Sequence, residues 1–171
     1  EGTEYYIQID NAKAGDEFTL AEAEFGQGET RDNPIIVENG TFTFGTETYG
    51  DYWLQYTADK GGMLVIKSDV PYNYTEKMLY GKPSDSYLSE MVMSNFGGST
   101  STTVYGAEVI ASAGDVFLVN LKMTAPHDGC TVTFTIRDFE EGEAAATAIE
   151  LTADEPVVVP SVSCTTPVWY K

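Results

Sequence analysis

The residues best suited to chemistry in this sequence are its carboxylates, and they do not form a catalytic pattern. The chain holds 27 Asp and Glu residues but a single histidine, His127, and two cysteines, Cys130 and Cys164. A histidine-based triad, a multi-histidine metal site and a cysteine-rich scaffold are therefore poorly supported. No nucleophile-elbow, zinc-protease or phosphate-loop motif occurs. Residues 127–130 favour a hairpin turn over a thiol site, and we expect a protein that is not an enzyme.

Calcium is the ion that these acidic residues suit best. Asp10, Asp32 and Asp51 lie near the ends of predicted strands, and the first two are each followed by an asparagine. Carboxylate and amide oxygens are the ligands that Ca²⁺ prefers. The three aspartates are therefore candidate calcium ligands, although no EF-hand loop accompanies them. The alternative is a solvated acidic surface that binds no metal.

The tyrosines form a second candidate site. The chain has 11 of them, and Tyr72, Tyr74 and Tyr87 fall in a loop-rich middle segment. Exposed aromatic rings stack on sugar rings through apolar contact, so these residues predict a possible glycan site. Ordinary packing and loop anchoring is the competing interpretation. For the cysteines, spacing does not decide between a Cys130–Cys164 disulfide and two free thiols.

The net charge of −18 excludes two classes of partner. Nucleic acid and anionic membranes repel an acidic surface. The acids are unevenly placed: residues 1–60 hold 13 acids and 3 bases, and residues 138–155 hold 7 acids and no base. Between them, residues 61–137 hold 7 acids and 5 bases. No run of 18 apolar residues exists, so we expect no membrane insertion.

The elements that must position these residues are strands. Apolar and polar residues alternate with period two through most of the chain, and Gly, Asn, Asp and Pro turns recur about every ten residues. The pattern predicts an all-β, antiparallel β-sandwich, jelly-roll-like, with little or no helix. One helical turn is allowed within residues 143–148. Predicted strands include residues 6–9, 18–21, 35–37, 41–44, 52–57, 63–67, 77–80, 103–105, 116–121 and 130–136.

An internal repeat is also visible. Residues 5–9 are echoed by 117–121, residues 15–19 by 129–133, and residues 25–29 by 139–143. Ile35 then matches Ile149, and Trp53 matches Trp169, with the offset drifting only from 112 to 116 residues. Order and spacing both hold over about fifty residues, as expected of repeated units.

The repeat predicts a domain organisation. Residues 26–139 would form one complete sandwich, residues 1–25 the terminal strands of a preceding repeat, and residues 140–171 the first strands of a following one. The chain is then expected to be a fragment of a longer tandem array. The alternative is that residues 1–171 form one elaborated sandwich.

Several motifs resemble a known family. They are a Gly-Glu turn, the Asn33-Pro34-Ile35 strand, Gly50-Asp51-Tyr52-Trp53 opening a central strand, Gly61-Gly62, and Ala113-Gly114-Asp115-Val116-Phe117. Over residues 26–139 the chain resembles the bacterial pre-peptidase C-terminal domain, a jelly-roll-like sandwich attached to secreted proteases and other exported proteins. The resemblance implies a non-catalytic module that binds matrix or carbohydrate, or that spaces and assembles other domains.

These observations predict a secreted or cell-surface, bacterial module with a structural or adhesive role in a stalk, filament or surface assembly. Its expected partners are neighbouring repeats or copies of itself, joined through strand edges. A carbohydrate-binding module is the first alternative, and an accessory domain of a secreted hydrolase is the second. No cofactor is expected apart from possible Ca²⁺.

Overall fold

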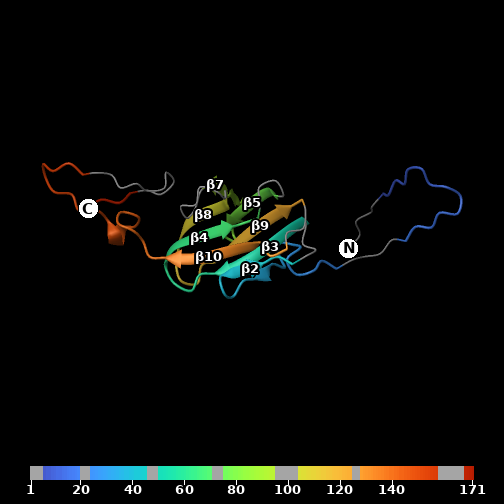
Figure 1. Cartoon of the computed structure of the whole chain (residues 1–171), viewed down its shortest axis with the longest axis horizontal. Coiled ribbons are helices and arrows are strands. Elements are labelled where there is room, and N and C mark those ends of the chain that lie inside the picture. Colours follow the sequence, from blue (N-terminus) through green and yellow to red (C-terminus); the bar gives the residue numbers. More distant parts are fainter. Residues whose placement is uncertain are drawn as a thin grey trace.

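The protein is a β-sandwich, as the alternating pattern predicted. The computed structural model describes residues 6–19, 24–45, 50–70, 75–94, 104–124, 128–157 and 168–171. Within these ranges two five-stranded sheets pack face to face (Figure 1). The helical structure described is a single 3₁₀ turn, η2 (Ala145–Thr147), inside the segment expected to hold one turn. No helix in the described part of the chain is long and apolar enough to span a membrane.

Each sheet has long central strands and short edges. The first sheet has the order β1 (Ile35–Ile36), β3 (Gly50–Thr57), β9 (Val116–Met123), β5 (Thr75–Gly81) and β6 (Ser89–Glu90). The second has the order β2 (Thr41–Thr43), β10 (Thr131–Arg137), β4 (Gly62–Ser68), β8 (Val104–Ala111) and β7 (Val92–Ser94). Edge strands of two or three residues offer little backbone for pairing with another chain, which protects the sandwich from edge-to-edge association.

The strand pairs are nested as in a jelly roll. β2 pairs with β10, β3 with β9, β4 with β8, and β5 with β6, all antiparallel. This is the pairing of one long hairpin rolled into two sheets, and it confirms the jelly-roll-like sandwich. β1 adds to this arrangement by pairing with β3 in parallel.

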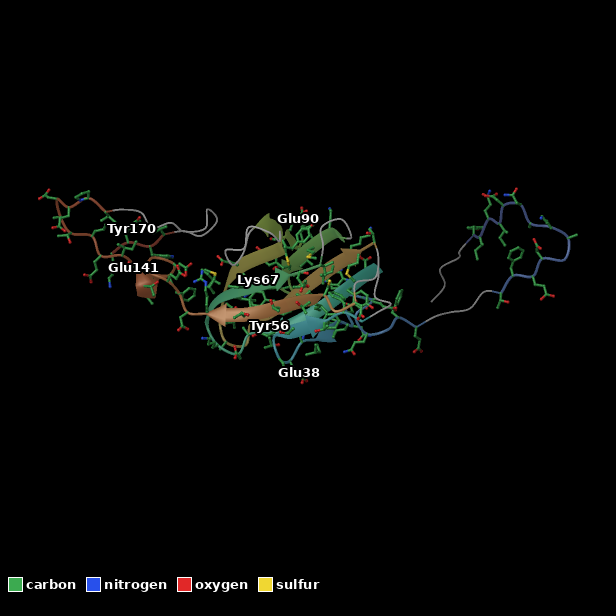
Figure 2. The ribbon with its side chains drawn as sticks, in the orientation of Figure 1. Glu38, Tyr56, Lys67, Glu90, Glu141 and Tyr170 are labelled. Carbon is green, nitrogen blue, oxygen red and sulfur yellow. The ribbon has the colours of Figure 1, made fainter. Side chains whose placement is uncertain are left out.

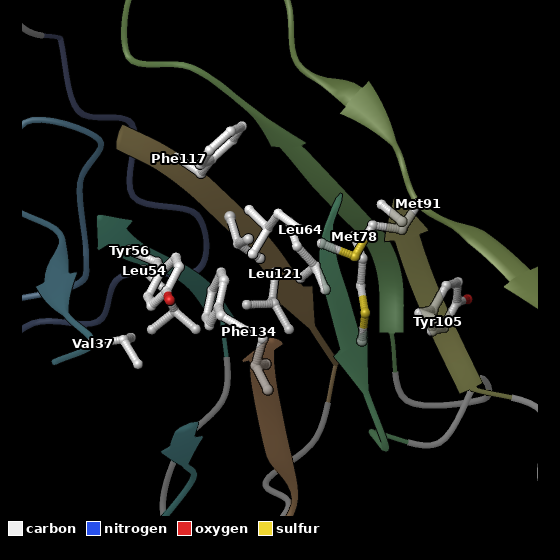
Figure 3. Close-up of a cluster of buried hydrophobic side chains, with 14 of the residues drawn as sticks. Val37, Leu54, Tyr56, Leu64, Met78, Met91, Tyr105, Phe117, Leu121 and Phe134 are labelled. Atoms are coloured by element: carbon white, nitrogen blue, oxygen red, sulfur yellow. The ribbon is translucent and has the colours of Figure 1, made fainter. Parts of the chain in front are cut away.

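The core fills the space between the sheets (Figure 3). Alternate residues of the central strands point inward, and Leu54, Leu64, Met78 and Leu121 are fully buried there. Tyr56 and Phe134 come from opposite sheets and stack with ring centroids 4.9 Å apart. This aromatic contact joins β3 to β10 across the sandwich.

Alternation predicts six core residues, namely Trp53, Tyr56, Leu64, Ile66, Leu118 and Phe134, and four of them (Tyr56, Leu64, Ile66 and Phe134) belong to the buried core. Leu118 is buried outside that cluster. Trp53 is not in the core. Leu54 and Tyr56 point inward from β3, and alternate residues of a strand point to opposite faces, so Trp53 points outward. The Arg31 guanidinium lies 5.9 Å from the centre of the Trp53 ring on that outer side.

Residues 6–9 differ from the prediction. Their pattern predicts a strand, but the described segment 6–19 contains no strand and forms a loop beyond one end of the sandwich (Figure 1). Phe18 and Thr19, the described part of the next predicted strand, are also outside any strand. A strand needs a hydrogen-bonded neighbour, and alternation alone does not supply one.

Candidate functional site

A glycine-centred turn precedes β1. The amide of Gly28 donates to the carbonyl of Asn33 at 2.6 Å, and the carbonyl of Gly28 accepts from the amide of Trp53 at 2.7 Å. The Glu29 carboxylate accepts from the amide of Gly26 at 2.6 Å. Gly28 has φ +89°, and a Cβ there would lie 2.8 Å from the Ile35 side chain. The position therefore requires glycine.

The same turn occurs again after β10. Gly142 donates to the carbonyl of Thr147 at 2.6 Å and accepts from the amide of Trp169 at 2.7 Å. The Glu143 carboxylate accepts from the amide of Glu140 at 2.7 Å. Gly142 has φ +82°, and a Cβ would lie 3.0 Å from Val168. Each of the three hydrogen bonds described for the first turn thus has a counterpart here.

The strands that follow the two turns also correspond. Ile35 pairs with Leu54 in parallel, and Ile149 forms a parallel bridge with Tyr170. The next hydrogen bonds match as well, from Val37 N–H to Gln55 O at 2.8 Å and from Leu151 N–H to Lys171 O at 2.7 Å. Gly40 and Asp154 each lie 12 residues after the turn glycine, and they have φ values of +67° and +65°. Aspartate is one of the few non-glycine residues that tolerate this conformation.

A buried ion pair fixes the second turn to the sandwich. The Arg137 guanidinium at the end of β10 donates to both carboxylate oxygens of Glu143, at 2.6 and 2.7 Å. Glu143 is only 4% exposed. Glu108 and Glu140 lie 3.7 and 3.8 Å from the same guanidinium. A two-point contact of this kind fixes orientation as well as distance. It ties the turn to the end of β10, and Figure 2 shows Glu141 and Tyr170 beyond that end of the sandwich.

The pair perturbs both of its members. The hydrogen bonds from Arg137, together with the amide of Glu140, hold the pKa of Glu143 below its usual value despite burial. The hydrogen bonds to Glu143 raise the pKa of Arg137 still further. Both groups are therefore charged at neutral pH. The first turn has no matching ion pair in the sequence. Arg137 lies six residues before Glu143, and the residue six positions before Glu29 is Ala23, which carries no charge.

Of the aromatic candidates, Tyr87 is the one inside the described residues. Its side chain is 91% exposed in the loop between β5 and β6. Tyr72 and Tyr74 lie outside the described residues, so a shared face stays a prediction. The base of the same loop is held by Arg31, which donates to the carbonyls of Pro83 and Asp85 at 3.0 and 2.6 Å.

The three candidate calcium ligands lie on separate elements. Asp10 belongs to the segment 6–19 and accepts from the Gln8 side chain, Asp32 lies in the first glycine turn, and Asp51 is in β3. Within the described residues, no three acidic, histidine or cysteine side chains are grouped so as to hold a metal ion. Calcium stays a prediction with a direct test. If calcium stabilises the chain, EDTA should lower its melting temperature. An unchanged melting temperature would contradict the calcium prediction.

Cys130 is half-buried just before β10 and packs against the core. Burial raises the pKa of its thiol, and the nearby charge of Asp69 adds to the shift. A raised thiol pKa lowers the thiolate fraction and with it the reactivity. Cys164 and His127 lie outside the described residues, so the Cys130–Cys164 pairing stays a prediction.

Two open hollows flank the turn at Asn39 and Gly40. One of about 470 Å³ lies on the outer face of the second sheet, and one of about 350 Å³ lies on the other side of the turn. Threonines and single charges such as Lys67 line the first, and Glu38, Asp59 and Lys60 line part of the second. The mixed charges and open shape point to no single ligand chemistry.

Sequence reasoning missed Arg137 and Glu143. The acidic stretch 138–155 had the pattern of a solvated connection, and Glu143 is instead buried in a two-point ion pair. A signal was present in the repeat itself. Glu29 and Glu143 both directly follow the repeated glycine, and an acid retained beside a turn glycine is suited to accept backbone amides.

Comparisons with models of protein families, with curated proteins and with solved structures find no match to the chain.

Proposed function

We propose that the chain is a non-catalytic, extracellular module of a tandem-repeat protein, with a structural or adhesive role in a stalk, filament or surface assembly. In this reading residues 26–139 are one complete unit, and residues 140–171 open the next. The resemblance to pre-peptidase C-terminal domains implies the same class of role. Bacterial origin and a cell-surface or secreted location belong to this proposal.

The observation that carries the proposal is the recurrence of the glycine turn. The turns at Gly28 and Gly142 share their hydrogen bonds, their positive φ and the parallel strand contact that follows. The second copy directly follows the last strand of the sandwich. A fold that starts its first element again at that point has the order of a repeat array.

The Arg137–Glu143 pair supports a mechanical role. A flexible linker would let successive units rotate freely. Here β10 is instead tied to the next turn by two charged hydrogen bonds, at 2.6 and 2.7 Å. Lys60 adds an exposed ion pair with Asp138 at 3.1 Å in the same region. A stalk or filament requires defined orientation between units, and an ion pair at the junction supports such a role.

The test is to complete the second unit. We expect a chain in which Lys171 is followed by residues 56–139 to fold as two sandwiches, because Gln55 and Lys171 hold equivalent positions. Small-angle scattering should then show an elongated particle, and calorimetry about twice the unfolding enthalpy of the original chain. Appended residues that stay unfolded would favour the single elaborated sandwich. A second appended chain, with residues 56–139 in scrambled order, is the matched control.

A carbohydrate-binding role is the second candidate, and the exposed ring of Tyr87 favours it. A glycan array distinguishes the two roles. Binding that Tyr87→Ala abolishes and Tyr87→Phe retains would support the glycan site, since stacking needs the ring and not the hydroxyl. An array without binding would leave the structural role.

A further inference from the structure

Among the described residues, the backbone at Tyr170 is paired on one side only. Trp169 and Lys171 direct their hydrogen bonds toward Gly142 and Ile149. Successive residues of a strand point their backbone groups to opposite sides, so those of Tyr170 face away from Ile149. Within the described residues, neither the amide nor the carbonyl of Tyr170 has a hydrogen-bond partner.

The complete unit shows what belongs at such a position. Leu54 is the counterpart of Tyr170. It pairs with Ile35, the counterpart of Ile149, on one side and with Val119 of β9 on the other. Leu54 and Val119 are both fully buried in the core. Tyr170 is 37% exposed. A strand with the β9 pattern would cover it.

The chain carries a second segment with that pattern. Residues 5–9 repeat the order of apolar residues, side-chain amide and apolar residue found at 117–121 in β9. Ile7 and Ile9 match Val119 and Leu121, which are 0% exposed, yet Ile7 and Ile9 are 62% and 44% exposed. Exposed apolar residues at positions that are core in the repeat indicate an interaction surface.

A turn in this segment could suggest a different alignment. The Asp16 carboxylate accepts from the amide of Lys13 at 2.8 Å, as the Asp115 carboxylate accepts from that of Ser112 at 3.0 Å. Aligning these turns would equate residues 17–24 with β9 and leave no counterpart of β10 before Gly28. β10 is paired on both sides, with β2 and β4, and cannot be skipped. The alignment of residues 5–9 with β9 keeps every strand.

We infer that residues 6–9 of one chain pair antiparallel with residues 168–171 of a second copy, so that chains join head to tail by strand addition. The inference rests on the repeat organisation proposed above. The β3–β9 register places Ile7 opposite Tyr170 and Gln8 opposite Trp169. Residues 6–19 lie beyond one end of the sandwich, and residues 138–157 and 168–171 lie beyond the opposite end (Figure 1), so the partner is another molecule. Main-chain hydrogen bonds and alternate apolar side chains are the usual basis of strand addition.

Cysteine cross-linking tests the register. In a Cys130→Ala, Cys164→Ala background of the full chain, Gln8→Cys combined with Trp169→Cys creates a non-hydrogen-bonded pair, whose Cα atoms lie about 4.5 Å apart. This distance permits a disulfide. In oxidised glutathione we expect dimers and longer oligomers on a non-reducing gel, with at least a tenfold excess over the matched control, Ala21→Cys with Trp169→Cys. The control corresponds to the competing alignment.

Three outcomes would overturn the inference: equal cross-linking in both pairs, preferential cross-linking through position 21, or cross-linking within one chain. None of them bears on the two-unit chain proposed above. If that chain folds while position 8 fails to cross-link, the array stands and each unit is completed by its own chain. If position 8 cross-links while the two-unit chain fails to fold, strand addition stands without the array.

Discussion

At the level of single residues, the Arg137–Glu143 pair is the contact whose removal has the most specific consequence. Glu143 is buried, while the side chain of Arg137 is 28% exposed. We expect Glu143→Gln to weaken docking of the second turn by about 1–3 kcal/mol, because it replaces charged hydrogen bonds and leaves Arg137 without its counter-charge. Fluorescence of Trp169 in a Trp53→Phe background reports this docking, since the Trp169 amide donates to Gly142.

The pH dependence of this docking has a definite sign. The pKa of Glu143 is lowered in the folded chain, chiefly by the hydrogen bonds from Arg137. A carboxylate of this kind stabilises fully above its unfolded pKa of about 4.3, and the contribution is lost as pH falls through the folded value. Docking should therefore be constant from neutral pH down to about pH 5 and weaken below it. Glu143→Gln should lose this acid transition, and the exposed neighbour variant Glu141→Gln should keep it.

At the level of elements, the glycine turn before β1 sets the geometry of the sheet edge. In Gly28→Ala, the positive φ costs about 1–2 kcal/mol, and contact of the new Cβ with Ile35 adds about 1–3 kcal/mol. Gly114→Ala is the matched control, since Gly114 has φ +86° with nothing within 4 Å of a Cβ. Urea unfolding should show a larger loss for Gly28→Ala. Equal losses would mean that Ile35 adapts to the methyl group without cost.

Strand positions were predictable from alternation, but strand partners were not. β4 and β10 follow the sequence closely, because Leu64, Ile66, Val132 and Phe134 point to one side and that side is the core. The nested pairing of β2 with β10 joins residues far apart in sequence, and no local pattern encodes it. Residues 6–9 alternate as well as β9 does, yet form no strand here, since pairing depends on a neighbour.

The candidate site was predictable in its outline and not in its contacts. The repeated glycine and glutamate marked both turns in the sequence. Burial of Glu143 depends on Arg137 reaching it from the end of β10, six residues earlier, a spacing that belongs to no regular helix or strand pattern. The acidity of residues 138–155 therefore hid an ion pair that only the bend after β10 creates.

At the level of the whole molecule, the charge of −18 opposes the strand addition inferred above. Residues 138–155 hold seven acids and no base, and residues 10–17 hold Asp10, Asp16 and Glu17 against Lys13. Joining these ends brings like charges together. Salt reduces the range of such repulsion from about 30 Å at 0.01 M to about 3 Å at 1 M. Sedimentation equilibrium should therefore show a mean mass that rises with NaCl over this range.

The salt response also identifies the kind of interface. An interface held by apolar residues and main-chain hydrogen bonds strengthens as repulsion is screened, whereas one held by ion pairs weakens. Ile7→Asp places a charge opposite Tyr170 in the inferred register and should keep the chain monomeric at every salt concentration. Glu17→Gln removes one repelling charge and should associate at lower salt than the unmodified chain. Association that falls with NaCl would contradict pairing through Ile7 and Tyr170, and would assign the contact to charged residues elsewhere on the surface.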